Sequence, residues 1–253
     1  MFRAVIPARF ASTRLPGKPL ADIGGRPMIR HVYERVAAAG AEEVIVATDD
    51  ARVQQACSAF GADVQMTSPS HLSGTDRLAE VAARRGWREA DVVVNVQGDE
   101  PLLPPALVRQ VAALLNADPG ADIATLGTPV VSIEEFLDPA VVKVVRRADG
   151  RALYFSRAPI PWHRDDAPAG MATQRNFTGA LRHLGLYAYR VGALQRLAAA
   201  APSALELAEK LEQLRALSLG MAITVGDALE PPGPGVDTPA DLERVRVLVG
   251  AGT

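Results

Sequence analysis

Residues 4–20, Ala-Val-Ile-Pro-Ala-Arg-Phe-Ala-Ser-Thr-Arg-Leu-Pro-Gly-Lys-Pro-Leu, place an apolar run directly before a loop of small residues. The run predicts a buried strand that stops at its first proline. Three cations follow in the loop, Arg9, Arg14 and Lys18. Ligands of open parallel sheets bind beyond the carboxyl ends of the strands, so the stretch predicts a nucleotide triphosphate site. The alternative is a solvated surface loop, and the spacing does not match a P-loop.

The bulk composition is typical of a soluble globular protein. The chain has 253 residues, of which 48% are hydrophobic and 22% charged. This length is enough for one large α/β domain or for one domain with a sizeable insert. A net charge of −2 gives no general attraction to nucleic acid. The single cysteine, Cys57, excludes an intrachain disulfide. No run approaches the ~18 apolar residues of a membrane span, and no signal peptide is recognisable, so we expect a cytoplasmic protein without nucleic-acid or membrane partners.

The first half of the chain alternates apolar runs with amphipathic segments. This pattern is typical of a mostly parallel sheet covered by helices on both faces, so we expect a three-layer αβα fold. Strands are expected over 2–6, 43–47, 63–66, 91–96 and 122–126, and helices over 28–39, 51–60, 75–85 and 104–116.

The second half changes character and predicts a smaller β-rich insert. Two β-branched runs, 141–146 and 152–156, indicate a hairpin that turns at Asp149-Gly150. Residues 157–181 are polar and irregular. The whole chain, 1–253, is expected to be one domain with this insert at about 130–190. The remaining elements are expected as strands over 183–189 and 221–225 and helices over 191–199, 204–219 and 239–249.

Two aspartates are candidate ligands of Mg²⁺, which proteins usually hold with one or two carboxylates plus substrate phosphates. Asp99 follows a buried strand and a glycine, at the carboxyl edge of the sheet. Asp237 lies in a stiff loop, Gly-Pro-Gly-Val-Asp-Thr-Pro. The alternatives are that Asp99 caps the following turn and that Asp237 is the N-cap of the last helix.

The segment Ser73-Gly74-Thr75-Asp76-Arg77 enters a helix after a strand. Its hydroxyls, backbone N–H groups and Arg77 indicate recognition of a base or ribose. An ordinary capping motif is the competing interpretation. We interpret Asp49 and Asp50, which precede the helix expected over 51–60, as helix-capping residues.

Seven segments taken in order resemble the 3-deoxy-manno-octulosonate cytidylyltransferase (CMP-Kdo synthetase) family over essentially the whole chain. The loop around 168–180 departs from the pattern, and its contacts are not assigned. The matching segments are 6–20, 71–77, 95–101, 152–157, 182–187, 211–215 and 235–239.

The resemblance implies a fold like that of the nucleotide-diphospho-sugar transferases. It also implies CTP as donor, 3-deoxy-D-manno-octulosonate (Kdo) as acceptor, Mg²⁺ as cofactor and a role in lipopolysaccharide biosynthesis. The anomeric 2-hydroxyl of Kdo would attack the α-phosphorus, and pyrophosphate would leave. By similarity, the catalytic residues are Arg9, Lys18, Asp99 and Asp237, and the metal ligands are Asp99 and Asp237. The nucleotide-binding residues are Ala8, Arg9, Ser12, Arg14, Lys18, Ser73, Gly74, Arg77 and Asp99.

The residues that match the acceptor site are Gln97, Arg157, His183, Tyr187, Glu212 and Gln213. Each of three has a structural alternative. Tyr187 alternates with leucines and could pack in the core, and His183 could end a strand in solvent. Glu212 could simply pair with Arg215 one helical turn later.

Three other functions remain open from the sequence. The acceptor could be 8-amino-Kdo or sialic acid. A nucleotide-sugar glycosyltransferase would usually carry an Asp-x-Asp metal motif, whereas this strand ends Gln97-Gly98-Asp99-Glu100. The third possibility is a nucleotide-binding protein without activity. The apolar hairpin over 141–156 needs a cover, because an unpaired apolar strand aggregates, and this indicates a homodimer formed through the insert.

Overall fold

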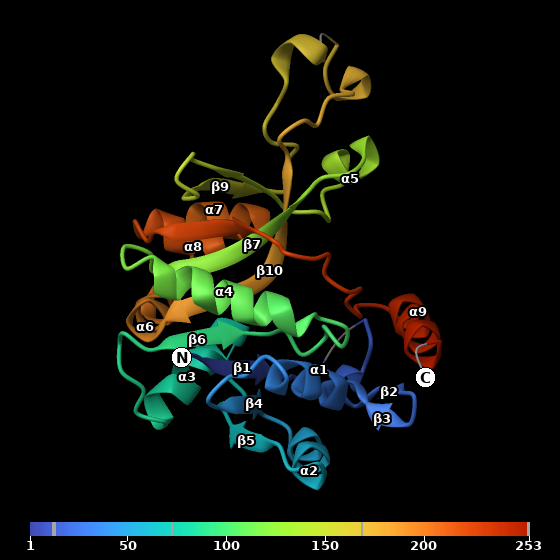
Figure 1. The fold of residues 1–253 in the computed structure, drawn as a ribbon, viewed down its shortest axis with the longest axis vertical. Coiled ribbons are helices and arrows are strands. Elements are labelled where there is room, and N and C mark those ends of the chain that lie inside the picture. Colours follow the sequence, from blue (N-terminus) through green and yellow to red (C-terminus); the bar gives the residue numbers. More distant parts are fainter. Residues whose placement is uncertain (12–13, 72, 168, 252–253) are drawn as a thin grey trace.

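The computed structural model describes residues 1–11, 14–71, 73–167 and 169–251. Within these residues, one nine-stranded sheet has helices on both faces, as Figure 1 shows. Seven strands lie side by side in the order β11-β7-β10-β6-β1-β4-β5. Their bounds are β1 (Arg3–Pro7), β4 (Val44–Thr48), β5 (Asp63–Met66), β6 (Val92–Asn95), β7 (Ile123–Pro129), β10 (Leu181–Arg190) and β11 (Ile223–Asp227).

The helices that cover the sheet pack on two hydrophobic cores. The first core receives α1 (Met28–Ala37), α2 (Ala51–Ala59) and α4 (Pro105–Ala117). The second receives α3 (Gly74–Arg84), α6 (Val191–Ala199) and α8 (Gln213–Ser218). Alternate residues of β1 enter opposite cores, Val5 the second and Ile6 the first. The predicted three-layer αβα fold is therefore confirmed.

Neighbouring strands among the seven of the central sheet pair in parallel, as expected, except where β10 is involved. Strand β1 pairs in parallel with β4 and β6, and β11 pairs in parallel with β7. Strand β10 is antiparallel to both β6 and β7. The carboxyl ends of β1 and β6 consequently meet at one edge of the sheet, where the sequence predicts the site.

The second half contains the predicted hairpin, β8 (Lys143–Arg146) with β9 (Ala152–Ser156). Its turn includes Gly150 at φ +85°, which side chains with a Cβ rarely adopt. Strand β10 pairs with β8 as well as with β6 and β7, so the range 130–190 includes a strand of the central sheet. The described residues between 157 and 180 form an arm that projects beyond α5 (Ile133–Leu137), with the short 3-10 helices η2 (Arg164–Asp166) and η3 (Met171–Thr173) (Figure 1).

The helix predicted over 204–219 is wrong as one element. It is divided into α7 (Ala204–Glu209) and α8 because Lys210 takes a left-handed conformation, with φ 53°. The break turns Leu211 and Leu214 into the second core, while Glu209 faces β9. A single straight helix would not reach both places.

The remaining elements surround the end of the chain. The short helix η1 (Lys18–Leu20) precedes a small hairpin, β2 (Asp22–Ile23) with β3 (Arg26–Pro27). Helix α9 (Pro239–Gly250) packs on this hairpin through Leu242 and Val245. Within the described part of the chain, the helices are all too short or too polar to cross a bilayer.

Candidate active site

Lys18 joins the predicted cationic loop to both predicted metal carboxylates. Its Nζ donates to Asp99 Oδ2 at 2.6 Å and to Asp237 Oδ1 at 3.0 Å. A third hydrogen bond, of 2.8 Å, goes to the carbonyl oxygen of Val236. The lysine side chain is only 15% exposed. Asp99 and Asp237, which follow Lys18 in the sequence by 81 and 219 positions, thus meet around its ammonium group.

The two carboxylates hold Lys18 in its charged form. Burial by itself lowers the pKa of the Lys18 amine, because the charged form loses water. The charges and hydrogen bonds of Asp99 and Asp237 outweigh this effect, and the pKa is raised above its ordinary value. Lys18 is therefore a permanent cation at neutral pH.

A cavity of about 640 Å³ opens beside this cluster. We call it the nucleotide cavity. It unites six of the residues predicted to bind the nucleotide, which come from the loop after β1, the start of α3 and the loop after β6. These six are Ala8, Arg9, Arg14, Lys18, Gly74 and Asp99.

Arg14 reaches the same cluster from the exposed side. Its Nη2 lies 3.0 Å from Asp237 Oδ1, and both side chains are more than half exposed. Ser12, which the resemblance also assigns to the nucleotide, lies outside the described residues. Gly98, in the loop after β6, lies against the end of β1, since a Cβ there would be 2.8 Å from the carbonyl oxygen of Pro7. That contact positions Asp99 at the rim of the cavity.

Asp99 and Asp237 fit the requirements of a magnesium ion. Their carboxylate oxygens already converge on one cation, Lys18 Nζ, and hard oxygen ligands are those that Mg²⁺ prefers. The N-cap of α9 is Thr238, which forms a capping box with Asp241, so the alternative role of Asp237 as N-cap is excluded. Among the described residues, no group of three or more His, Cys, Asp and Glu could hold a metal, and proteins usually bind Mg²⁺ with one or two carboxylates, several waters and substrate phosphates.

The expected nucleoside-binding segment is divided between two roles. Ser73 is the N-cap of α3 and forms a capping box with Asp76, as the capping interpretation predicts. Arg77 has a completely buried side chain that donates to Asp49 Oδ2 at 2.6 Å and to Thr67 Oγ1 at 2.7 Å. The guanidinium thus supports the end of β5 instead of facing the nucleotide cavity, because the buried charge requires the Asp49 carboxylate. Asp50 is the N-cap of α2, so the interpretation of Asp49 as a capping residue is wrong.

Unpaired polar atoms gather on the face of the sheet under α8. Tyr187 lies opposite Asn95 across β10 and β6. The Tyr187 hydroxyl, Asn95 Oδ1 and Glu212 Oε1 are buried and have no hydrogen-bond partner among the described residues. Such atoms cost about 1–3 kcal/mol each when they are left unpaired. They therefore indicate a polar ligand at this place.

Glu212 belongs to this group through its other oxygen. Its Oε2 accepts a hydrogen bond from the Thr75 hydroxyl at the start of α3. Burial raises the pKa of Glu212, against the hydrogen bonds of Thr75 and Ser73. Arg215 lies 3.8 Å from Glu212 Oε1, and its short contacts go to Glu206 instead. The pair with Arg215, which was the structural alternative for Glu212, is thus a secondary contact.

His183 is half-buried within β10 (Leu181–Arg190) and is not at a solvated strand end. Its ring packs against Phe155 and Tyr187, with centroids 5.0 and 5.2 Å away. Nε2 lies 3.0 Å from Thr125 Oγ1. Burial lowers the pKa of His183 from 6.5 to about 3, so the imidazole is neutral at physiological pH.

We expect His183 to make folding sensitive to acid. Between pH 6.5 and about 3 the unfolded chain binds a proton that the folded chain does not, so stability is lost as the pH falls below 6.5. From about pH 7 to about pH 5, this group should remove about 2 kcal/mol from the free energy of unfolding. Urea unfolding at both pH values should show that loss to be smaller in His183→Gln. An equal loss in both proteins would contradict the assignment.

The other expected acceptor residues lie in three places. The Arg157 guanidinium donates to the carbonyl oxygens of Glu209 and Pro139, at 2.7 and 3.0 Å. Gln213 is the first residue of α8 and is buried. Gln97 lines the nucleotide cavity and also a second cavity of about 790 Å³. The structure therefore brings Tyr187, His183 and Glu212 to one face, with Arg157 bound to the chain segment that precedes Glu212.

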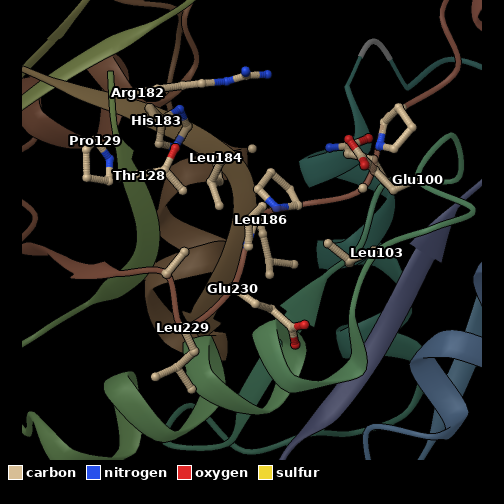
Figure 2. A pocket seen from close by; sticks show the side chains of 18 of the residues that line it. Glu100, Leu103, Thr128, Pro129, Arg182, His183, Leu184, Leu186, Leu229 and Glu230 are labelled. Carbon is tan, nitrogen blue, oxygen red and sulfur yellow. The ribbon is translucent and has the colours of Figure 1, made fainter. Parts of the chain in front are cut away.

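The second cavity contains residues that the sequence does not single out. Figure 2 shows Arg182 and His183 on one side of it and Glu100 on the other. Burial, together with the charges of Asp99 and Asp237, raises the pKa of Glu100 to about 7. Glu100 directly follows Asp99 in sequence, so proximity to the expected metal site is the signal that could have identified it.

The sequence and the fold are similar to those of known proteins. A family model described as cytidylyltransferase matches residues 3–223. A 3-deoxy-manno-octulosonate cytidylyltransferase of Thioalkalivibrio sulfidiphilus (strain HL-EbGR7) is 56% identical over 250 residues, which cover 99% of each chain. One of Halorhodospira halophila (strain DSM 244 / SL1) is 55% identical over 244 residues, 96% of this chain and 95% of the relative. A solved structure of CMP:2-keto-3-deoxy-manno-octonic acid synthetase complexed with CTP is similar over 100% of both chains, with 46% identity and a TM-score of 0.89.

Proposed function

The chain belongs to the cytidylyltransferase family, together with the 3-deoxy-manno-octulosonate cytidylyltransferases, and from that premise we propose that it transfers CMP from CTP to Kdo. The products are CMP-Kdo and pyrophosphate. The observation that carries the proposal is the convergence of Lys18, Asp99 and Asp237 at the rim of the nucleotide cavity. At this edge of the sheet, the two carboxylates are suited to bind a metal ion and the cation is suited to bind the phosphates of a metal-bound triphosphate.

The reaction is a displacement at phosphorus. The anomeric 2-hydroxyl oxygen of Kdo forms a bond to the α-phosphorus, and its proton is released to solvent. The bond from that phosphorus to the bridging oxygen breaks, and pyrophosphate carries the electron pair away. Such transfers depend on positioning and charge stabilisation more than on covalent catalysis. Lys18, Arg14 and Arg9 come from one loop and lie around the nucleotide cavity, where they would bind the phosphate oxygens. No covalent enzyme intermediate is required.

Asp99 and Asp237 are the residues that would hold Mg²⁺. When bound, the ion would offset the negative charge of the phosphates. Lys18 would then lie between the carboxylates and the nucleotide, as a cation that contacts both.

The acceptor is proposed to bind over the face that carries Tyr187, Asn95 and Glu212. Their unpaired atoms offer two acceptors and a hydroxyl to a polyhydroxylated sugar acid. The remaining proposed contacts are Gln97, Arg157, His183 and Gln213. Arg157 is the cation in this set that could pair with the sugar carboxylate, which would require its guanidinium to leave the carbonyl of Pro139.

Pyrophosphate release tests the function directly. Purified protein with CTP, Kdo and Mg²⁺ should release pyrophosphate, and omission of any one component should abolish the release. A panel of Kdo, 8-amino-Kdo and sialic acid, each at equal concentration, should favour Kdo. Preference for another acid would replace the acceptor, whereas CTP binding without any turnover would indicate a binding protein.

We further propose a homodimer that forms through the insert and works in the cytoplasm, where CTP is available, to supply lipopolysaccharide biosynthesis. Large apolar side chains are exposed on or near the arm, Trp162 at 40%, Met171 at 55% and Val131 at 80%. Exposed apolar residues gathered in one region favour a protein interface. Light scattering at micromolar concentration should give twice the chain mass of 26.7 kDa. A monomer mass, or a dimer that survives Trp162→Asp with Met171→Asp, would contradict this interface.

A further inference from the structure

Glu209, the last residue of α7, connects two segments that the proposed function assigns to acceptor binding. Its carboxylate accepts hydrogen bonds from Ser156 Oγ at 2.9 and 3.0 Å and from the Arg157 backbone N–H at 2.7 Å. A fourth bond, of 3.1 Å, comes from the Tyr154 hydroxyl. All four donated hydrogen bonds come from β9 or the residue that follows it. One side chain of α7 therefore fixes the end of β9.

The side chain of Arg157 in turn binds the backbone of Glu209. Arg157 Nε donates to the Glu209 carbonyl oxygen at 2.7 Å. The backbone N–H of Arg157 binds the Glu209 carboxylate while its side chain binds the Glu209 backbone. A pair held at two points cannot rotate about a single bond, so the relative orientation of the two segments is defined.

A buried lysine holds the other side of Arg157. Lys143 is 0% exposed, and its Nζ donates to the carbonyl oxygens of Arg157 at 2.8 Å, Asp138 at 2.9 Å and Val141 at 2.5 Å. Arg157 is consequently fixed through its N–H, its carbonyl and its guanidinium. Among the groups that hold Arg157, Glu209 is the one that lies just before α8, the helix that begins at Gln213.

The chain direction after Glu209 explains why this matters. Lys210 takes the left-handed conformation, and the chain then turns into Glu212 and Gln213 at the start of α8. Glu209 thus sets the separation between Arg157 on one side and Glu212 and Gln213 on the other. Among the described residues, its carboxylate meets only neutral donors within hydrogen-bond distance, and no cation forms a salt bridge with it. Such hydrogen bonds to an ionised acceptor are strong and directional.

We propose that Glu209 is a positioning residue for the acceptor, which holds Arg157 at the distance from Glu212 and Gln213 that the sugar acid requires. The proposal rests on the proposed function. Glu209 contacts neither Lys18 nor Asp99, so its role concerns the acceptor half of the site and leaves the nucleotide half unchanged.

Glu209→Ala is the main test, with steady-state kinetics in each substrate separately. The KM for Kdo should rise about tenfold, as expected for the loss of hydrogen bonds to a charged group, while the KM for CTP stays within about twofold. Glu209→Gln keeps one carbonyl oxygen that can accept from Ser156 and Arg157, so it should restore most of the Kdo affinity. Glu34→Ala, a glutamate on the exposed side of α1 that pairs with Arg30, is the matched control and should change neither KM.

A purely structural role would give a different result. Loss of stability alone lowers the active fraction and therefore kcat, and leaves both KM values unchanged. That outcome, or equal increases in both KM values, would overturn the proposal. If the wild-type protein does not use Kdo but uses another sugar acid, the proposed acceptor is wrong, and the same comparison is made with the acid it uses. If the wild-type protein uses no sugar acid, both the proposed function and the positioning role of Glu209 are wrong.

Discussion

Replacing Asp99 by asparagine should lower kcat for pyrophosphate release by about 10³-fold, with the fold preserved. The change keeps the size of the side chain and removes its negative charge. A metal carboxylate that stabilises the transferring phosphate contributes several kcal/mol to the transition state, and each 1.36 kcal/mol corresponds to a factor of ten. Asp99 is partly exposed at the rim of the nucleotide cavity, so the neutral amide has room and water there.

Two measurements distinguish a metal role from a structural one. The Mg²⁺ concentration for half-maximal activity should rise in Asp99→Asn, and the thermal unfolding midpoint should stay within a few degrees of wild type. Asp63→Asn is a matched control, because Asp63 is an exposed aspartate that pairs with Arg85 at the other end of the sheet. It should retain wild-type activity. If Asp99→Asn also turned over at the wild-type rate, Asp99 would be removed from the proposed metal site.

The sequence predicts the frame of the fold because its signals are local. Short apolar runs such as 92–94, set between amphipathic segments, predict buried strands, and the nine elements expected in the first half begin within one residue of their expected positions. The cationic loop and Asp99 follow two of these strands directly. Parallel strands put their carboxyl ends at one edge, so the meeting of Lys18 with Asp99 follows from the sheet.

The contacts that the sequence could not supply depend on tertiary structure. Asp237 approaches Lys18 because the loop before α9 lies directly against Leu102. Gly233 permits this approach, since a Cβ at Gly233 would be 2.6 Å from the carbonyl oxygen of Leu102. The break at Lys210 is equally invisible in the helical pattern, since it is imposed by the bonds of Glu209 to β9. Arg77 looks like a ligand contact by its place in a motif, but Asp49 and Thr67 enclose it. In each case a partner distant in sequence decides the orientation.

Replacing Lys18 by alanine should reduce kcat/KM for CTP by about 10²- to 10³-fold, the effect expected when one fixed positive group that faces developing charge is removed. Lys18 is held by three hydrogen bonds, and its side chain is mostly withdrawn from solvent. Lys18→Arg should recover only part of the activity, because a planar guanidinium cannot reproduce a point charge that contacts two carboxylates and a carbonyl.

The same variant gives a second result, of opposite sign, that a general loss of structure could not produce. In the free protein the Lys18 ammonium occupies the place where Asp99 and Asp237 converge, so it competes with a divalent cation for their oxygens. Removing it leaves two carboxylates without their shared cation. Lys18→Ala should therefore be stabilised against thermal unfolding by lower Mg²⁺ concentrations than wild type when CTP is absent, although it is far less active when CTP is present. If its Mg²⁺ requirement for stabilisation rose together with the loss of activity, the two carboxylates would not form the metal site, and Lys18 would act through the fold alone.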